Sequence, residues 1–510
     1  VKQSTDDRLR HHIYALTKTL HPGDSLQLNF SASYYHEGFS NNGLHTAVMN
    51  DGTWFGSDRW LPALGYQAHR ELDHERGRWQ YGLPERMRIR SLDDENARYD
   101  RSNREKIAFE AVVGTSADQT AVAPGRLEKT WSKDGRKYFQ YVADGPIRKM
   151  FHIYSANYQV HKTQWKGTDI EMFYNPANTM NLETFEQSVI ASTDYYSKHF
   201  SPYPFRQIKF VEYADPGIGG VALPGSIGYS TNFSWLDPEA GDRKFNLPFA
   251  VAAHEIAHQW WGHQLMPADV EGRLFLTESL AWYSALNVVE STHGKDHFDN
   301  LLTAMRKDFL SLQSGAVAPL LKVNDRFLAY RKGPLAMYAL RQYAGEEAVN
   351  LALRNLLRRL RRSEPRFATS LDFYREMKAV TPDSLHYLLK DLFETNTSWD
   401  LETNGASVQP SEDGSWLVSL EVIARKVRVD EAGIETEVPM NDLIEVGIYR
   451  NDNGYEHVLH LKKERIHSGI NHIVVKLSQK PDKAGIDPRN LLIDPDMFNN
   501  VKGVTERTRH

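Results

Sequence analysis

Apolar and polar positions alternate along much of the first 158 residues. A helical pattern over 7–20 opens the chain and ends at Pro22-Gly23, and Asp134-Gly135 is typical of a tight hairpin turn. The alternating runs cover residues 25–35, 107–115 and 127–142. Strict alternation is the pattern of a half-buried strand. We therefore expect residues 1–158 to form an N-terminal domain that is mostly β.

Apolar residues recur every three or four positions in the middle of the chain. An extended run over 169–174 precedes them. The helices that this spacing predicts cover residues 182–199, 248–265, 275–293, 296–312, 332–343, 346–362, 371–380 and 382–393. Pro248 suits a first helical turn, and Gly294 suits a helix end. Residues 159–398 are therefore expected to form a second, largely helical domain.

Short alternating runs return beyond residue 398. Turn residues such as Asp452-Asn453-Gly454 separate them. The runs cover residues 416–424, 443–449, 457–461 and 473–477. Short strands at such spacing predict a small β-sandwich over residues 399–510. The order of β, helical and β modules predicts an α+β multidomain protein.

The composition of the chain excludes several kinds of protein and of metal site. Lys and Arg number 61 and Asp and Glu 66, so the net charge is −5, which does not favour nucleic-acid binding. An arginine cluster at residues 354–362 alternates with leucines at the spacing of one helix face, as in an amphipathic helix. The chain has no cysteine, so His and carboxylates must hold any metal ion. No apolar run reaches the roughly 18 residues of a membrane span.

The predicted helix over 248–265 contains the pentad His254-Glu255-Ile256-Ala257-His258. Positions i and i+4 of a helix lie about 40° apart around its axis, so both imidazoles can reach one ion. Glu255 flanks that face, where a carboxylate can take a proton from metal-bound water. Two coincidental histidines on a structural helix are the alternative. The small and aromatic neighbours predict a buried helix, in which unpaired polar groups would be costly.

A third protein ligand is needed for a catalytic zinc site. Glu278 lies on the next predicted helix, 20 positions beyond His258, and Glu271 lies in the loop between them. We prefer Glu278, because a ligand on a helix is held more rigidly than one on a loop.

The run HEIAHQWWGHQL followed by TESLAWYSAL resembles the aminopeptidase N family of gluzincin zinc peptidases. That family carries His-Glu-x-x-His-x18-Glu, whereas 19 residues separate His258 and Glu278 here. The resemblance implies one zinc ion per chain, held by His254, His258 and Glu278, with Glu255 as general base. It also implies a β saddle, a thermolysin-like catalytic domain and a β-sandwich. The family's large C-terminal helical domain has no counterpart in this sequence.

A second motif of the family, Tyr-x-Lys-Gly, is similar to Tyr330-Arg331-Lys332-Gly333. The resemblance implies that the Tyr330 hydroxyl stabilises the transition state. Alone, Tyr330 would read as a buried aromatic residue beside a turn. Its position after the pentad favours the catalytic interpretation.

The family's amine-binding Gly-x-Met-Glu-Asn segment is not intact. Its place is taken by Gly220, Val221, Ala222 and Leu223, which we expect to line the substrate site without a glutamate. Glu212 and Asp215 lie nearby in sequence, but an ordinary surface role is the preferred interpretation for both. Strict aminopeptidase activity is therefore less firmly predicted than zinc-dependent hydrolysis.

A subgroup of the family, in which a bacterial ABC-type permease is fused to a peptidase-like domain, is similar in further stretches. They include residues 118–125 and 258–264. The resemblance implies that the chain is the soluble, extracytoplasmic portion of a longer bacterial membrane protein.

The sequence thus predicts a zinc metallopeptidase that acts on peptides and has no nucleic-acid partner. The alternative is a zinc-bound peptide-binding or sensory module of a membrane transporter with little catalysis. Glu255 favours the enzyme, because a binding module has no need of a general base.

Overall fold

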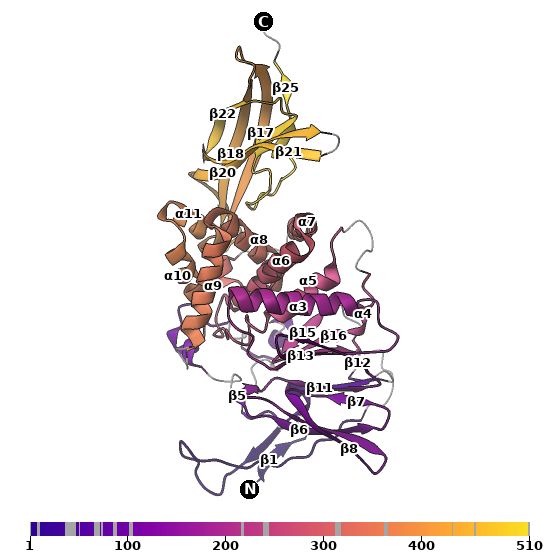
Figure 1. Cartoon of the computed structure of the whole chain (residues 1–510). Helices are drawn as coiled ribbons and strands as arrows, with labels where there is room; N and C mark the ends of the chain where they lie inside the picture. The colour runs from indigo at the N-terminus through magenta and orange to yellow at the C-terminus, as the bar shows by residue number, and fades with distance from the viewer. Residues whose placement is uncertain are drawn as a thin grey trace.

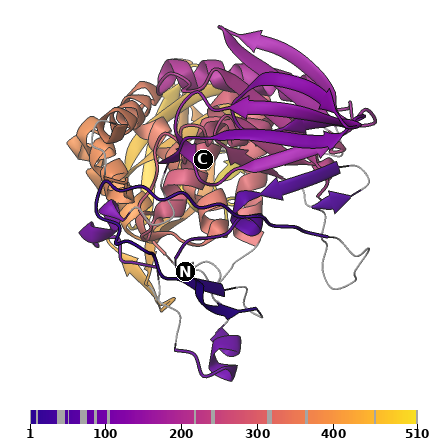
Figure 2. The same cartoon turned by 90° about the horizontal axis from the view of Figure 1, so that it is seen from below.

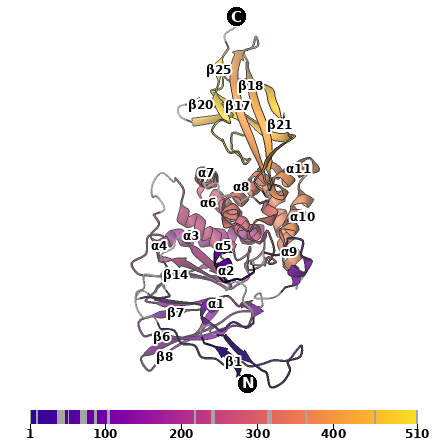
Figure 3. The ribbon, with the colours of Figure 1, turned by 180° about the vertical axis from the view of Figure 1, so that it is seen from behind.

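The computed structural model describes most of the 510-residue chain. The described residues are 2–7, 11–35, 47–49, 52–65, 72, 75–84, 89–100, 106–215, 219–237, 244–311, 318–361, 366–430, 432–452 and 455–507. Three parts are stacked along one axis, with a β-rich N-terminal part at one end, helices in the middle and a β-rich C-terminal part at the other end (Figures 1 and 3). This is the mixed multidomain architecture that the sequence predicts.

The N-terminal part contains small antiparallel sheets. Strands β3, β4, β11 and β7 form one sheet, β6, β9 and β8 a second, and β5 pairs with β10. The bounds are β3 Val48–Met49, β4 Gly52–Gly56, β5 Lys106–Ile107, β6 Glu110–Ser116, β7 Thr120–Val122, β8 Arg126–Lys133, β9 Arg136–Val142, β10 Ile147–Arg148 and β11 His152–Ala156. Asp134 and Gly135 make the β8–β9 turn with φ of 50° and 73°, which a hairpin of this type requires.

Two expectations for the N-terminal part are wrong. The predicted helix over 7–20 is replaced by a hairpin of β1 (Lys2–Asp6) and β2 (His11–Tyr14) where the chain is described. The predicted strand over 25–35 has no strand assignment, and Leu26, Leu28 and Phe30 are exposed. The alternation in sequence is real, but no described strand pairs with this segment.

The middle part is built on one five-stranded sheet in the order β12, β13, β14, β16, β15. Their bounds are β12 Gln159–Trp165, β13 Thr168–Tyr174, β14 Gln207–Tyr213, β15 Gly220–Leu223 and β16 Ser226–Ser230. Helices α3 and α5 lie on one face of the sheet, and the N-terminal strands lie beyond the other face (Figure 1). Lys209 of β14 crosses to the N-terminal part, where its Nζ donates to Ala123 O at 2.7 Å.

The predicted helices are present in the order expected, with α3 between β13 and β14 and the others after β16 in the chain. They are α3 Leu182–His199, α4 Thr231–Ser234, α5 Leu247–Ala257, η4 Phe275–Ser279, α6 Leu280–His293, α7 Lys295–Ser311, α8 Arg326–Ala344, α9 Glu346–Arg361, α10 Ser370–Val380, α11 His386–Leu389 and η7 Lys390–Glu394. Two bounds differ from expectation: α5 ends at Ala257 instead of 265, and α8 begins before Tyr330. In α9, Leu353, Leu356 and Leu357 are buried, as an amphipathic helix requires.

The C-terminal part is a β-sandwich of two main sheets. Strands β19, β18, β17 and β25 form one sheet with β22, and β21, β20, β23 and β24 form the other. The bounds are β17 Thr397–Pro410, β18 Trp416–Val429, β19 Glu435–Val438, β20 Asn441–Asp452, β21 Tyr455–His467, β22 Gly469–Leu477, β23 Lys483–Ile486, β24 Val501–Gly503 and β25 Thr505–Glu506. Seen from below, the sandwich lies behind the helices (Figure 2).

One large apolar core runs from the sheet through the helices into the sandwich. Within it, Trp260 and Trp261 are fully buried directly after α5, and Phe275 is fully buried at the start of η4. The segments that carry the predicted metal ligands are therefore held by close packing inside this core.

Candidate metal centre

Helix α5 carries the first four residues of the pentad. Its start is fixed by Asn246, whose side chain accepts from Phe249 N at 3.0 Å, and by Pro248 in the first turn. His254 and Glu255 lie in its last turn, and both are buried. The small residues Ala252, Ala253 and Ala257 let the sheet and α3 approach the helix closely. The local sequence therefore determines both the helix and its depth.

His258 caps the C-terminal end of α5. Its Nδ1 lies 3.0 Å from Trp261 O, so Nδ1 carries the proton that this carbonyl accepts. The Nε2 lone pair then faces His254 Nε2 at 3.2 Å. Two imidazole nitrogens turned toward each other are poised to share a single cation.

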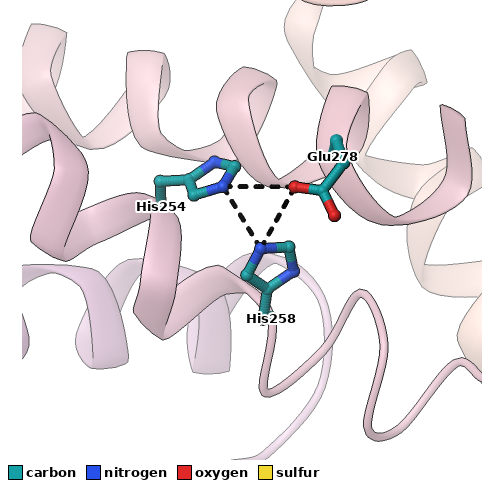
Figure 4. Close-up of side chains that lie close together, drawn as sticks. All are labelled: His254, His258 and Glu278. Carbon is teal, nitrogen blue, oxygen red and sulfur yellow. Dashed lines mark hydrogen bonds and ion pairs between the residues drawn. The ribbon is translucent and has the colours of Figure 1, made fainter. Parts of the chain in front are cut away.

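Glu278 completes the arrangement from η4, a single π-helical turn at the start of α6. Its Oε2 lies 3.4 Å from Nε2 of both His254 and His258 (Figure 4). The three ligand atoms lie within 4.8 Å of one another, and this is the one such His and carboxylate group among the described residues. The spacing of 19 residues between His258 and Glu278, one more than in the family motif, therefore still brings the glutamate beside the histidines.

The donor set fits a divalent metal ion. Two neutral imidazoles and one carboxylate are ligands that zinc accepts in catalytic sites. His254 Nδ1 and Glu278 Oε2 are buried and have no hydrogen-bond partner among the described residues. A buried carboxylate oxygen without a hydrogen bond is costly unless a cation lies against it.

The pKa values of His254 and Glu278 agree with this fit, whereas His258 keeps its proton at pH 7 as long as no metal ion displaces it. Burial lowers the pKa of His254 to about 4, so its imidazole is neutral at pH 7. Burial opposes ionisation of Glu278, but the two histidines outweigh it and hold its pKa well below the usual range. For His258, burial is likewise outweighed, and the Glu278 carboxylate raises the pKa to about 9. A metal ion would compete with that proton for Nε2.

Glu255 lies against strand β15 instead of joining the ligand group. Gly220 leaves room for it, since a Cβ at that position would lie 2.6 Å from Glu255 Cγ. Burial raises the pKa of Glu255 to about 7. The carboxyl group therefore changes protonation near neutral pH, as a general base requires.

Tyr330 lies in the first turns of α8, half-buried, with its ring centroid 5.7 Å from that of His254. It is a helical residue and not one beside a turn. Burial and the Glu278 carboxylate raise the pKa of its hydroxyl above the usual value, so it stays a proton donor. Ser279 Oγ donates to Ala329 O at 2.7 Å and joins η4 to α8.

Strand β15, which comprises Gly220, Val221, Ala222 and Leu223, is the last strand of its sheet and pairs only with β16 among the described strands. Two residues of the segment after α5 hold it in place. Gln259 Nε2 donates to Leu223 O at 2.9 Å, and its Oε1 accepts from Gly225 N at 3.0 Å. His263 Nε2 lies 3.2 Å from Ala222 O.

Neither Gln259 nor His263 was predicted to have this role. Both lie in the HQWWGHQL run, but the carbonyls that they contact are about 40 positions earlier in the chain. A contact over such a distance in the chain leaves no local pattern in the sequence from which it could be predicted.

Two other carboxylates are placed away from the ligand group. Glu271 accepts from Leu92 N at 3.2 Å, so the loop carboxylate faces the N-terminal part and Glu278 is the glutamate beside the histidines. The expected surface role of Glu212 is wrong. Its side chain is buried, accepts from Asn175 N at 2.9 Å, and is also bonded by Asn178. Glu212 holds the loop after β13.

A helix-borne pair of histidines, a glutamate on the next helical segment and a buried carboxylate beside them define the class of metallohydrolases. Residues 182–392 match the family model described as the Peptidase family M1 domain. The middle of the chain therefore contains a domain of the peptidase class, and the match covers all the residues of the candidate metal centre.

Known proteins similar to this chain are aminopeptidases. The chain is 25% identical over 194 residues to endoplasmic reticulum aminopeptidase 2 of Homo sapiens, a match that covers 36% of this chain and 20% of that protein. It is 26% identical over 200 residues to aminopeptidase N of Lactococcus lactis subsp. lactis, covering 36% of this chain and 23% of that protein. The match thus spans about a fifth to a quarter of these relatives.

A solved structure supports the fold over a longer stretch. Aminopeptidase A of Legionella pneumophila, crystallised in complex with aspartic acid, superposes with a TM-score of 0.53. The superposition covers 79% of this chain and 45% of that one at 16% identity, so it concerns the fold alone. Within the described residues, every helix is too short or too polar to cross a bilayer.

Proposed function

We propose that this chain is a zinc-dependent metallopeptidase that hydrolyses peptide bonds. One observation carries the proposal: two imidazole nitrogens and a carboxylate oxygen converge at 3.2–3.4 Å, with a second buried carboxylate alongside. The Peptidase family M1 match over the same residues supports it.

His254, His258 and Glu278 would hold the zinc ion. Zinc in such a site lowers the pKa of a bound water and polarises a carbonyl group. The His258 Nδ1 bond to Trp261 O fixes the tautomer that leaves Nε2 free for the ion.

Glu255 acts as the general base and then the general acid. Its carboxylate accepts a proton from the attacking water and returns it to the leaving amine. The contact with Gly220 keeps the carboxylate buried beside β15, where bulk water does not compete for the proton. Tyr330 donates its hydroxyl hydrogen to the oxyanion that develops on the scissile carbonyl.

Strand β15 holds the peptide. One edge of β15 pairs with β16, and the other pairs with no described strand, so an extended substrate can add to the sheet there. The four residues of β15 carry no carboxylate, and the strand itself therefore offers no counter-charge to a peptide N-terminus. The enzyme is aminopeptidase-like in its catalytic residues but not in this strand.

The experiment is to compare the unmodified protein with its Glu255→Gln variant. We expect both to bind one zinc ion per chain, and the variant to lose turnover by about 10²–10⁴-fold, the contribution of a general base. Metal content is measured by elemental analysis, and cleavage of a peptide library is followed by mass spectrometry. Cleavage by the variant at the unmodified rate would exclude Glu255 as the base. A zinc-loaded unmodified protein that cleaves no peptide would support the binding module instead.

A further inference from the structure

The two histidines of the candidate metal centre are held in different ways. His258 Nδ1 lies 3.0 Å from Trp261 O, and this hydrogen bond fixes the orientation of its ring. His254 Nδ1 is buried and has no hydrogen-bond partner among the described residues. Metal-binding histidines almost always donate this N–H to a carbonyl, a carboxylate or water. The orientation of the His254 ring must therefore come from another kind of contact.

An indole ring packs against His254. Trp282 lies on α6, four positions after Glu278, a spacing that places two side chains on the same side of a helix. The ring centroids of Trp282 and His254 are 4.6 Å apart, and the ring planes are inclined by 34°, within the range of attractive aromatic pairs. Both residues are more than nine-tenths buried, with 7% of Trp282 and 2% of His254 exposed. The indole and the imidazole therefore restrict each other's position.

The polar group of this indole is not used. Trp282 Nε1 is buried and has no hydrogen-bond acceptor in the part of the chain that the structure describes. Buried tryptophans usually pair this N–H, as Trp261 does with Ser284 Oγ at 2.8 Å. Leaving a buried donor unpaired is unfavourable, so a hydrogen bond does not explain a tryptophan at this position. The feature that remains is the aromatic ring, which lies against a candidate metal ligand.

We propose that Trp282 is a positioning residue for the metal centre, because its ring holds the His254 imidazole in the orientation that directs Nε2 toward the ion. The proposal rests on the proposed function, in which His254 is a zinc ligand. Stacking on Trp282 does for His254 what the bond to Trp261 O does for His258. The contact also suits the charge, because an imidazole that shares its lone pair with a cation becomes electron-poor, and the face of an indole attracts positive charge.

The test measures metal binding without any peptide. The zinc affinities of the unmodified protein and of Trp282→Leu are compared by competition with a chromogenic chelator. The visible absorption spectrum of the cobalt-loaded proteins reports the geometry of the ligands. We expect Trp282→Leu to bind zinc about ten- to hundredfold more weakly, the range for removing a group that orients a ligand, and to change the cobalt spectrum. If Trp282→Leu does not fold, Trp282→Met carries the test, because methionine adapts to irregular spaces in a core.

Two further variants separate stacking from general packing. Trp282→Phe keeps an aromatic ring and should retain most of the zinc affinity and the cobalt spectrum of the unmodified protein. The matched control is Trp399→Leu in β17 of the sandwich. Trp399 is likewise buried in the main core, and its Nε1 donates to Asp442 Oδ2 at 2.9 Å. We expect Trp399→Leu to lower the free energy of unfolding and to leave the zinc affinity unchanged.

Three results would overturn the proposal. They are a zinc affinity and cobalt spectrum of Trp282→Leu equal to those of the unmodified protein, a loss in Trp282→Phe as large as that in Trp282→Leu, and an equal loss of zinc affinity in Trp399→Leu. The expected metal results without peptide cleavage by the unmodified protein would refute the peptidase function and leave the positioning role of Trp282 standing.

Discussion

The candidate centre has two sides of different construction. The helical side consists of α5, η4 and α8, which carry His254, Glu278 and Tyr330 inside the main core. The strand side is β15, four residues at the edge of a sheet, held to the segment after α5 by Gln259 and His263. The helical side is fixed by close packing, and the strand side by a few hydrogen bonds.

This difference assigns separate tasks to the two sides. Metal ligands need positions fixed within fractions of an ångström, which a packed core provides. A substrate strand needs a free edge, which a packed core cannot provide. We therefore expect changes that displace the ligand-bearing segments of the helical side to remove the metal ion, and changes on the strand side to impair turnover while the metal stays bound.

The largest effect is expected for Gly333→Ala. A Cβ at Gly333 would collide with Ser279 Oγ, one residue after the ligand Glu278, and would push α8 away from η4. We expect loss of zinc binding and of turnover, with a destabilisation of about 1–3 kcal/mol from overpacking. Elemental analysis and urea unfolding measure the two. The control is Gly405→Ala in the sandwich, where a Cβ meets nothing within 4 Å. Full zinc occupancy in Gly333→Ala would show that the α8–η4 contact does not position the ligands.

Gly220→Ala tests the strand side. The new Cβ would lie 2.6 Å from Glu255 Cγ, so either Glu255 or β15 must move. We expect kcat to fall by about 10²–10⁴-fold, the contribution of a general base, at unchanged zinc content. Gly219→Ala is the matched control, because a Cβ there meets nothing within 4 Å. Equal loss of zinc in Gly220→Ala would contradict the separation of tasks between the two sides.

The sequence predicts the helical side far better than the strand side. His254 and His258 are four positions apart at the end of one helix and Glu255 directly follows His254, so their proximity follows from helix geometry alone. Glu278 follows from the next helix, although the π-helical turn that presents it has no signature in the sequence. Gln259 and His263 act through contacts with residues far away in the chain, and a local sequence pattern carries no information on such contacts.

The two failed predictions in the N-terminal part have the same origin. Residues 25–35 alternate like a strand. A strand forms, however, only where a neighbouring strand pairs with its backbone N–H and C=O groups. The helical pattern over 7–20 gives way to the β1–β2 hairpin because a short helix without a packed face is marginal in water. In the middle part and the sandwich, where the core covers one face of nearly every element, the predicted elements are present.

The smallest effect is expected at β14, where the sheet that carries β15 rests on the N-terminal part. Lys209 of β14 is buried, donates to Ala123 O and Gly125 O, and lies 4.1 Å from the Tyr141 ring centroid, with no ion pair among the described residues. Burial lowers its pKa from 10.5 to about 7. Between these two values the unfolded chain binds a proton that the folded protein does not, so this group makes stability rise with pH.

From pH 7 to pH 9 the gain is about 2 kcal/mol, since each pH unit is worth at most about 1.4 kcal/mol for one proton. Lys209→Met removes the titrating group but keeps the length of the side chain. We therefore expect the free energy of unfolding of the unmodified protein, relative to Lys209→Met, to increase by that amount over this range in urea titrations. A difference that does not change with pH would mean that the amine stays charged in the folded protein, and that β14 contacts the N-terminal part through a fixed ammonium group instead of a neutral amine.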